Sequence, residues 1–350
     1  MIGERLKRAR SAAGLSMAKL GKAVGVSANM IKKYEHDESM PSSPVLIKMA
    51  EALDVRTEFF FRPLTVKLAG IEYRKKASTP QKVLDRIAAD VLDQAERWLE
   101  LKNLWPDFPI PAFERPVNLP KVSTLGDLEA FSVAVRHAWQ LGLNPLPDMI
   151  DMLESRGILV IVTESDQADK VDGMQASVEK QPVIVISDQW PGCRQRFTLA
   201  HELGHLLLHD VLSSDIDEEQ ACNRFASAFL LPRDGAIEHL GAQRRSIDWK
   251  ELYLLKHEYG LSMASILYRC QDLGILSREK YHSQFIQFSS NGWRKKEPGQ
   301  AYPKEQTLLF EQLVYRGAGE GLISDSKAAE LLKMPVARFR QDKMMEGVEA

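Results

Sequence analysis

The sequence has few cysteines, almost no net charge and no long apolar run. Its three cysteines, Cys193, Cys222 and Cys270, are widely spaced and form no CxxC pair, so no disulfide framework is expected and a reducing compartment is favoured. The formal net charge of -2 excludes a chain that is basic throughout, so any surface for nucleic acid must be local. Without a membrane-length apolar segment, and with the charged N-terminus MIGERLKRAR, we expect a cytoplasmic protein that does not contact membrane.

What the chain does contain is the segment RQRFTLAHELGHLLLHD, residues 194–210. Residues four apart lie on one face of a helix, so His201 and His205 can bind the same metal ion. Glu202 lies beside that ion, where a carboxylate can take a proton from metal-bound water, and it is the candidate general base. The alternative is a pair of core histidines, but a chance match to this five-residue pattern is expected in only about one percent of such sequences.

A catalytic zinc needs a third protein ligand and an open fourth position for water. His209 lies eight residues beyond His201, about 12 Å along a helix, and is therefore too far away to share the ion. The next acidic segment, SSDIDEEQ, precedes a helical apolar stripe. Both Glu218 and Glu219 border that stripe, so periodicity leaves the choice between them open.

The stretch RFTLAHELGHLLLH, followed by EQACNRFA and LLP, resembles the ImmA/IrrE family of zinc metallopeptidases. The resemblance implies that Glu219, four residues before Asn223, completes the metal site with His201 and His205. Cys222 is then expected to be a small buried residue in the ligand helix. The cofactor is expected to be Zn²⁺, with Mn²⁺ or another divalent ion as alternatives. Glu202 would deprotonate the zinc-bound water for attack on a peptide carbonyl.

Residues 1–62 read as short helices separated by tight turns. The spacing of LGKAVGVSANMI predicts two helices joined by a glycine-containing turn, with Ser16 and Ser27 as N-caps. Through residue 33 the segment has eight lysines and arginines against one acid, which suits a phosphate backbone. The alternative is a helical bundle with a solvated basic face, or a domain that binds a protein partner.

This N-terminal segment resembles the XRE (Cro-type) helix-turn-helix domain along IGERLKRAR, GLS, VGVS, IKKYEHDESMP and LIKMAEALDV. The resemblance implies that residues 27–36 form the recognition helix and that the partner is double-stranded operator DNA. By the docking geometry of the motif, base edges face the start of this helix, and phosphates face two lysines further on. The expected DNA contacts are Ser27, Ala28, Asn29, Lys32 and Lys33. Such domains usually bind as dimers, so a homodimer is expected.

The rest of the chain divides by periodicity and composition. Residues 63–122 are predicted to be a connector with a long helix starting at Pro80 and a proline-rich linker. Residues 123–276 are predicted to hold the peptidase domain, with strands at 158–164, 173–179 and 182–187. PVIVIS is the candidate edge for a substrate strand, and the alternative is that these strands form the core under the metal helix. Residues 246–276 are predicted to form helices that pack around the active site. The alternative is a second helix-turn-helix. Residues 277–350 are predicted to be a C-terminal helical extension, with helices at 304–316 and 324–332.

The predicted fold is multidomain and mostly α with a small β-sheet: an all-α helix-turn-helix domain plus an α+β zincin-like metallopeptidase domain. The family resemblance implies a DNA-binding regulator that cleaves a helix-turn-helix repressor or another regulatory protein in a stress or mobile-element response. The alternative is a transcriptional repressor or antitoxin-like regulator whose metal domain senses or binds a ligand without cleaving it. An intact Glu202 favours the enzyme.

Overall fold

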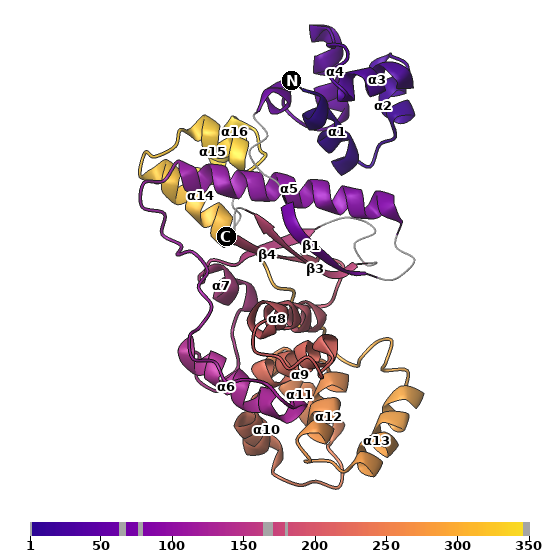
Figure 1. The fold of residues 1–350 in the computed structure, drawn as a ribbon, viewed down its shortest axis with the longest axis vertical. Helices are drawn as coiled ribbons and strands as arrows, with labels where there is room; N and C mark the ends of the chain where they lie inside the picture. The colour runs from indigo at the N-terminus through magenta and orange to yellow at the C-terminus, as the bar shows by residue number, and fades with distance from the viewer. Residues whose placement is uncertain (1, 63–67, 76–79, 164–170, 179–180, 346–350) are drawn as a thin grey trace.

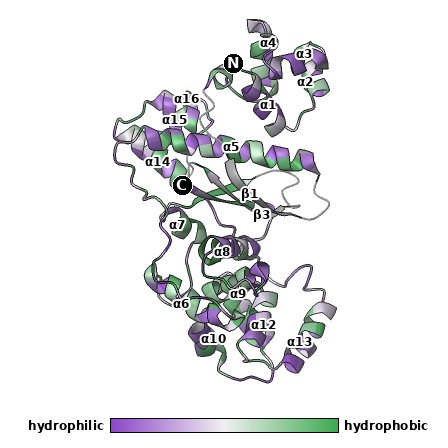
Figure 2. Cartoon of the chain, viewed as in Figure 1, coloured by the Kyte–Doolittle hydropathy of each residue, from purple (hydrophilic) through white to green (hydrophobic). Residues whose placement is uncertain are grey.

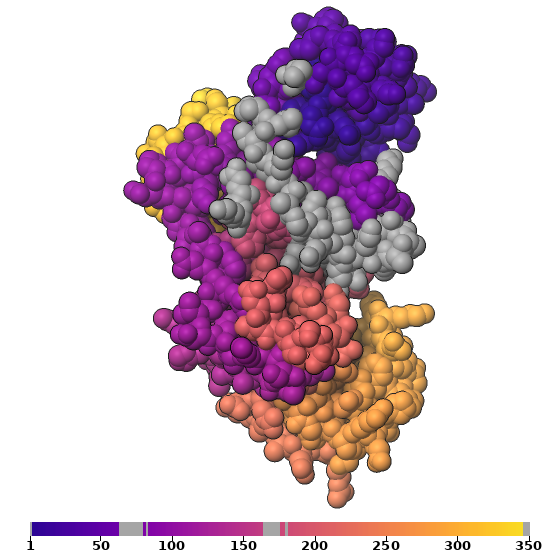
Figure 3. Space-filling view, in the orientation of Figure 1, coloured from indigo at the N-terminus to yellow at the C-terminus, as the bar shows by residue number. Residues whose placement is uncertain are grey.

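The computed structural model describes residues 2–62, 68–75, 80–163, 171–178 and 181–345 (Figure 1). Its N-terminal lobe stands at one end of the molecule (Figure 3). The lobe contains α1 (Gly3–Ala12), α2 (Met17–Val24), α3 (Ala28–Glu35), α4 (Ser43–Ala52) and the 3-10 helix η1 (Thr57–Phe61). Leu6, Leu20 and Ile31 are fully buried in its core.

The turn between α2 and α3 follows the prediction. The hydroxyls of Ser16 and Ser27 accept hydrogen bonds from the amides of Lys19 and Met30, and thereby cap the two helices. Gly25 ends α2 in the left-handed conformation, at φ 80°, which glycine adopts at little cost.

A four-stranded sheet forms the centre of the larger part of the molecule. Its strands are β1 (Leu68–Lys75), β2 (Leu159–Thr163), β3 (Val171–Val178) and β4 (Gln181–Ser187), in the order β1-β3-β4-β2. The β2–β4 pair is parallel, and the β1–β3 and β3–β4 pairs are antiparallel. Positions 164 and 179 of the predicted strands lie outside the described residues.

Two sequence expectations about this sheet need correction. The segment after residue 62 contributes an edge strand, β1, where only a partly extended connector was expected. PVIVIS is not an edge, because β4 lies between β3 and β2. Its residues from Pro182 to Ser187 are all buried, and a continuous apolar run of this kind is typical of a strand that is covered on both faces.

Alternate residues of the inner strands enter two different cores, as the two-residue period of a strand requires. Leu159, Ile161, Val183 and Val185 face α5 (Gln81–Asn103) and the C-terminal helices. These helices are α14 (Leu309–Gly319), α15 (Asp325–Leu331) and α16 (Val336–Lys343). Hydrophobic and hydrophilic residues alternate along α5 (Figure 2). The helix of the predicted connector and the C-terminal helices thus share one core with the sheet.

Val160, Ile184 and Ile186 face the opposite way, toward the helices of the other layer. This layer contains α7 (Met149–Glu154) and α8 (Gly192–Leu208), which carries the HELGH pentad. Beyond α8, on the side away from the sheet (Figure 1), this layer also contains η2 (Leu125–Asp127), α6 (Leu128–Ala138), α9 (Glu218–Leu230), α10 (Arg233–Leu240), α11 (Trp249–Tyr259), α12 (Met263–Asp272) and α13 (Arg278–Ser290). Leu252, Leu255 and Ile266 of α11 and α12 are buried in the core of α8, which favours the packing interpretation of this region.

The segment between α13 and α14 is less helical than expected. The helix predicted from Lys304 starts at Leu309. Residues 301–308 run instead as irregular chain beside the start of α8, where the Glu305 amide donates to Gln195 Oε1 at 3.1 Å. Within the described part of the chain, every helix is too short or too polar to cross a bilayer.

Candidate metal centre

Helices α8 and α9 approach closely because the pentad contains a glycine. A Cβ added at Gly204 would lie 3.1 Å from Phe225 Cδ1 and 3.2 Å from the Cα of Cys222. A larger residue would therefore push the helices apart. Cys222 is fully buried in this contact, which agrees with its expected packing role.

The close approach brings the three predicted ligands together. His201 Nε2 lies 3.1 Å from His205 Nε2 and 3.4 Å from Glu219 Oε2, and His205 Nε2 lies 3.5 Å from Glu219 Oε1. Ligands held about 2.0–2.1 Å from a tetrahedral zinc ion are separated from one another by about 3.3 Å. The donor set thus fits a divalent ion in both chemistry and spacing. Its assignment as a metal site remains a prediction.

The two adjacent glutamates face different nitrogens of the histidine pair. Glu219 lies at the Nε2 side, as described, whereas Glu218 Oε1 lies 2.9 Å from His205 Nδ1. Asn223 Oδ1 lies 3.0 Å from His201 Nδ1. Acceptors at both Nδ1 atoms favour the tautomer that leaves Nε2 open to an ion. This orienting role of Asn223 was not predicted, although its place one helical turn after Glu219 puts both on one face of α9.

A second group of possible donors, His205, Glu218 and Cys222, also lies within 4.8 Å. We favour the group with Glu219, because the other one would require a metal at the His205 nitrogen that faces Glu218. It would also require the Cys222 sulfur as a metal ligand, although this side chain packs between α8 and α9. Burial raises the pKa of the other two thiols, Cys193 and Cys270, to about 12, so these cysteines are poor nucleophiles at neutral pH.

The candidate metal centre is buried on its α8 side and open on its α9 side. Glu202 is 3% exposed and His201 is buried, whereas the side chains of Glu218 and Glu219 are 53% and 54% exposed. Solvent therefore reaches these donors from the side of α9. His209 lies apart from these donors, is exposed, and bonds to Asp210, which raises its pKa.

The predicted DNA contacts all lie on one exposed surface. Ser27 caps α3, and Ala28, Asn29, Lys32 and Lys33 are exposed along that helix. Three of the eight N-terminal basic residues do not contribute to this surface, because Arg5 and Arg8 pair with Glu96 and Arg10 pairs with Glu35. The other five, Lys7, Lys19, Lys22, Lys32 and Lys33, are all lysines and all exposed.

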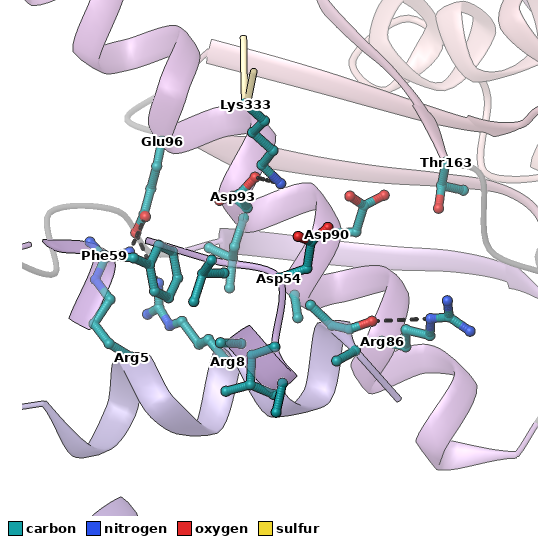
Figure 4. A pocket seen from close by; sticks show the side chains of 18 residues that line it. Arg5, Arg8, Asp54, Phe59, Arg86, Asp90, Asp93, Glu96, Thr163 and Lys333 are labelled. Atoms are coloured by element: carbon teal, nitrogen blue, oxygen red, sulfur yellow. Dashed lines mark hydrogen bonds and ion pairs between the residues drawn. The ribbon is translucent and has the colours of Figure 1, made fainter. Parts of the chain in front are cut away.

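The N-terminal lobe meets α5 through polar contacts around a cavity of about 470 Å³ (Figure 4). Arg5 and Arg8 of α1 both pair with Glu96 of α5, and Arg86 Nε donates to the Ala12 carbonyl at 3.1 Å. We call this contact the lobe joint. Its cavity contains none of the predicted site residues.

Family models match both parts of the chain. Residues 6–60 match a helix-turn-helix model, and residues 153–271 match the IrrE N-terminal-like domain of peptidase family M78. The chain thus combines a helix-turn-helix domain of XRE type with an ImmA/IrrE-like domain, as the two resemblances implied.

The curated relatives are similar to only part of the chain. A protein of Pyrococcus furiosus named as an HTH-type transcriptional regulatory protein is 34% identical over 27% of this chain, and the match spans 28% of its own length. An uncharacterized HTH-type transcriptional regulator of Sinorhizobium fredii is 29% identical over 25% of this chain and 64% of its own length. The phage CTXphi repressor RstR of Vibrio cholerae is 37% identical over 15% of this chain and 48% of its own length.

Proposed function

We propose that this protein is a DNA-binding transcriptional regulator with a zinc-dependent endopeptidase domain, which cleaves a repressor or another regulatory protein. The proposal rests mainly on the convergence of His201, His205 and Glu219 beside the buried Glu202. The three donors have the spacing of zinc ligands, and the match to peptidase family M78 supports a hydrolytic use of the site.

A divalent ion bound there would supply Lewis acidity toward water and a peptide carbonyl. Glu202 accepts the proton of the attacking water, and its buried position limits competing hydration of the carboxylate. Asn223 and Glu218 hold the two imidazole rings in place through their Nδ1 atoms. The exposed α9 side admits the substrate chain.

The helix-turn-helix domain would direct this activity to an operator. The exposed start of α3 is placed to read base edges, and Lys32 and Lys33 are placed to contact phosphates. The similarity to a phage repressor supports DNA as the partner. A homodimer, a cytoplasmic location, Zn²⁺ rather than Mn²⁺, and a helix-turn-helix repressor as substrate remain predictions of this proposal.

The second candidate is a regulator whose metal domain is sensory. The relatives support its regulatory part, since they are named as transcriptional regulators or a repressor. In that case Glu202 would have no catalytic role.

The Glu202→Gln variant separates the two functions. It replaces the proton acceptor with a neutral amide of the same shape and keeps all three ligands, so metal and DNA binding should be unchanged. Proteomic comparison of cells that carry the wild type and the variant would identify proteins cleaved only by the wild type. Disappearance of a regulatory protein in wild-type cells alone supports the endopeptidase. Identical proteomes and identical transcription in both strains would support the sensory regulator.

A further inference from the structure

Residues 299–308, which we call the C-terminal strap, lie outside the region that matches the peptidase family model and yet contact the helix that carries the HELGH pentad. A Cβ added at Gly192, the first residue of α8, would lie 1.7 Å from the Pro303 carbonyl oxygen. The strap therefore passes directly over the start of α8.

Glu305 is the buried residue of an otherwise largely exposed strap. It is 8% exposed, and its Oε1 pairs with the guanidinium of Arg196 in α8, which is fully buried. Its Oε2 accepts hydrogen bonds from the amides of Met149 and Ile150, at 2.7 and 3.2 Å. One carboxylate thus joins the start of α7 to the body of α8.

The neighbouring residues of α8 continue this connection. Arg196 also donates to the Leu146 carbonyl at 2.6 Å. Gln195 accepts from the Glu305 amide and donates to the Ser187 carbonyl at the end of β4, at 2.9 Å. These bonds fix α8 relative to α7, to the sheet and to the strap.

The connection matters for the metal centre because its ligands come from two helices. Arg196 lies five residues before His201, about 7.5 Å along the helix axis, whereas Glu219 belongs to α9. A small slide of α8 against α9 would change the spacing of the two imidazoles from Glu219. Misplacement by about 1 Å is enough to cost about two orders of magnitude in rate.

We infer that Glu305 is a positioning residue for the metal centre, which acts through Arg196 and the start of α7. The functional unit of the peptidase domain then includes the C-terminal strap as well as the matched region. This inference builds on the proposed function, but it is tested by metal binding as well as by activity.

The test uses full-length protein and compares three variants. Glu305→Gln keeps an acceptor for the Met149 and Ile150 amides but removes the charge opposite Arg196. The double variant Arg196→Met with Glu305→Gln removes both charges, so that neither is left buried alone, and it keeps the acceptor for the Met149 and Ile150 amides. The control is Arg244→Met, which removes a partly exposed ion pair with Glu251 on the surface.

We expect Glu305→Gln and the double variant to weaken Zn²⁺ binding about tenfold in chelator competition. The visible absorption spectrum of the Co²⁺-substituted protein should change in both, because the ligand geometry changes. Arg244→Met should match the wild type in both measurements. If a protein substrate is found, kcat should fall more than KM rises.

If Glu305 had only a structural role, its replacement would lower the free energy of unfolding and leave the metal centre unchanged. Folded variants with the zinc affinity and Co²⁺ spectrum of the wild type would therefore overturn the inference. A wild type that binds zinc but cleaves no protein would overturn the endopeptidase and not this inference, since the metal measurements do not depend on turnover.

Discussion

The molecule has two internal joints of opposite character. The lobe joint holds the helix-turn-helix domain on α5 through ion pairs around a cavity of about 470 Å³. The strap joint holds α8 through the buried Arg196–Glu305 pair and backbone bonds. Among the described residues, the apolar core of the lobe is separate from both cores of the body. A polar joint without a shared core can open, whereas a buried joint opens only with the fold.

The largest effect is expected from Glu305→Ala. This change leaves the buried Arg196 guanidinium without its carboxylate, and breaking a buried pair from one side costs about 3–5 kcal/mol. Chemical denaturation of the wild type and variant measures the loss. A cost below about 1 kcal/mol would show that the strap joint resembles a surface contact.

The next effect is a dependence on pH from Glu154, at the end of α7. Burial raises the pKa of this carboxyl from its ordinary 4.5 to about 8. Since the folded state binds this proton more tightly, the contribution of Glu154 to the free energy of unfolding should be greatest below about pH 4.5 and fall as the pH rises to about 8. Each unit of pKa difference is worth about 1.4 kcal/mol, so the fall amounts to a few kcal/mol.

Denaturant titrations across this pH range measure that slope. Glu154→Gln should flatten it, because the amide has no proton to lose. A wild-type slope unchanged by the substitution would assign the pH dependence to other groups.

A smaller effect on stability is expected from Glu96→Gln in the lobe joint. The side chains of Arg5, Arg8 and Glu96 are 3%, 16% and 12% exposed, and the amide can still accept a hydrogen bond from a guanidinium, so the cost should lie below that of a buried pair broken from one side, which is about 3–5 kcal/mol. The variant should nevertheless separate the lobe from α5, since Arg5 and Arg8 lose the carboxylate that they share. Small-angle X-ray scattering should show a larger radius of gyration, and added salt should enlarge the wild type in the same way. A variant with the radius of gyration of the wild type would mean that the other contacts of the lobe joint are enough to hold the lobe on α5.

The smallest expected effect concerns DNA. Lys32→Ala should weaken operator binding and reduce the slope of affinity against salt by about one, the contribution of one phosphate contact. Arg8→Ala is the matched control from the lobe joint, because its guanidinium pairs with Glu96 rather than facing DNA. Equal effects of both changes on the salt slope would contradict the assignment of the DNA surface to α3.

Sequence patterns predicted the features that depend on residues close together in the chain. His201 and His205 follow from the four-residue spacing on a helix, and the caps at Ser16 and Ser27 follow from turn chemistry. The two family resemblances agree with the matched models. The choice of Glu219 over Glu218 required resemblance, because both border the apolar stripe of α9 and differ only in which imidazole nitrogen they face.

Features that depend on distant partners could not be predicted in this way. β1 becomes an edge strand only through its pairing with β3, about a hundred residues further on. Glu305 is one acid among many until the fold places it on Arg196, 109 residues away. The interior place of β4 was in principle predictable from its continuous apolar run, which indicates burial on both faces.

The central claim is that Glu219 binds the metal while Glu218 orients His205. Its most direct test is metal content by mass spectrometry on the wild type, Glu219→Ala and Glu218→Ala, purified with zinc and dialysed against a weak chelator. We expect about one zinc per chain in the wild type and loss of zinc in Glu219→Ala. Zinc should be retained in Glu218→Ala, with affinity weakened about 10- to 100-fold. Loss of zinc from Glu218→Ala together with full occupancy in Glu219→Ala would contradict the account.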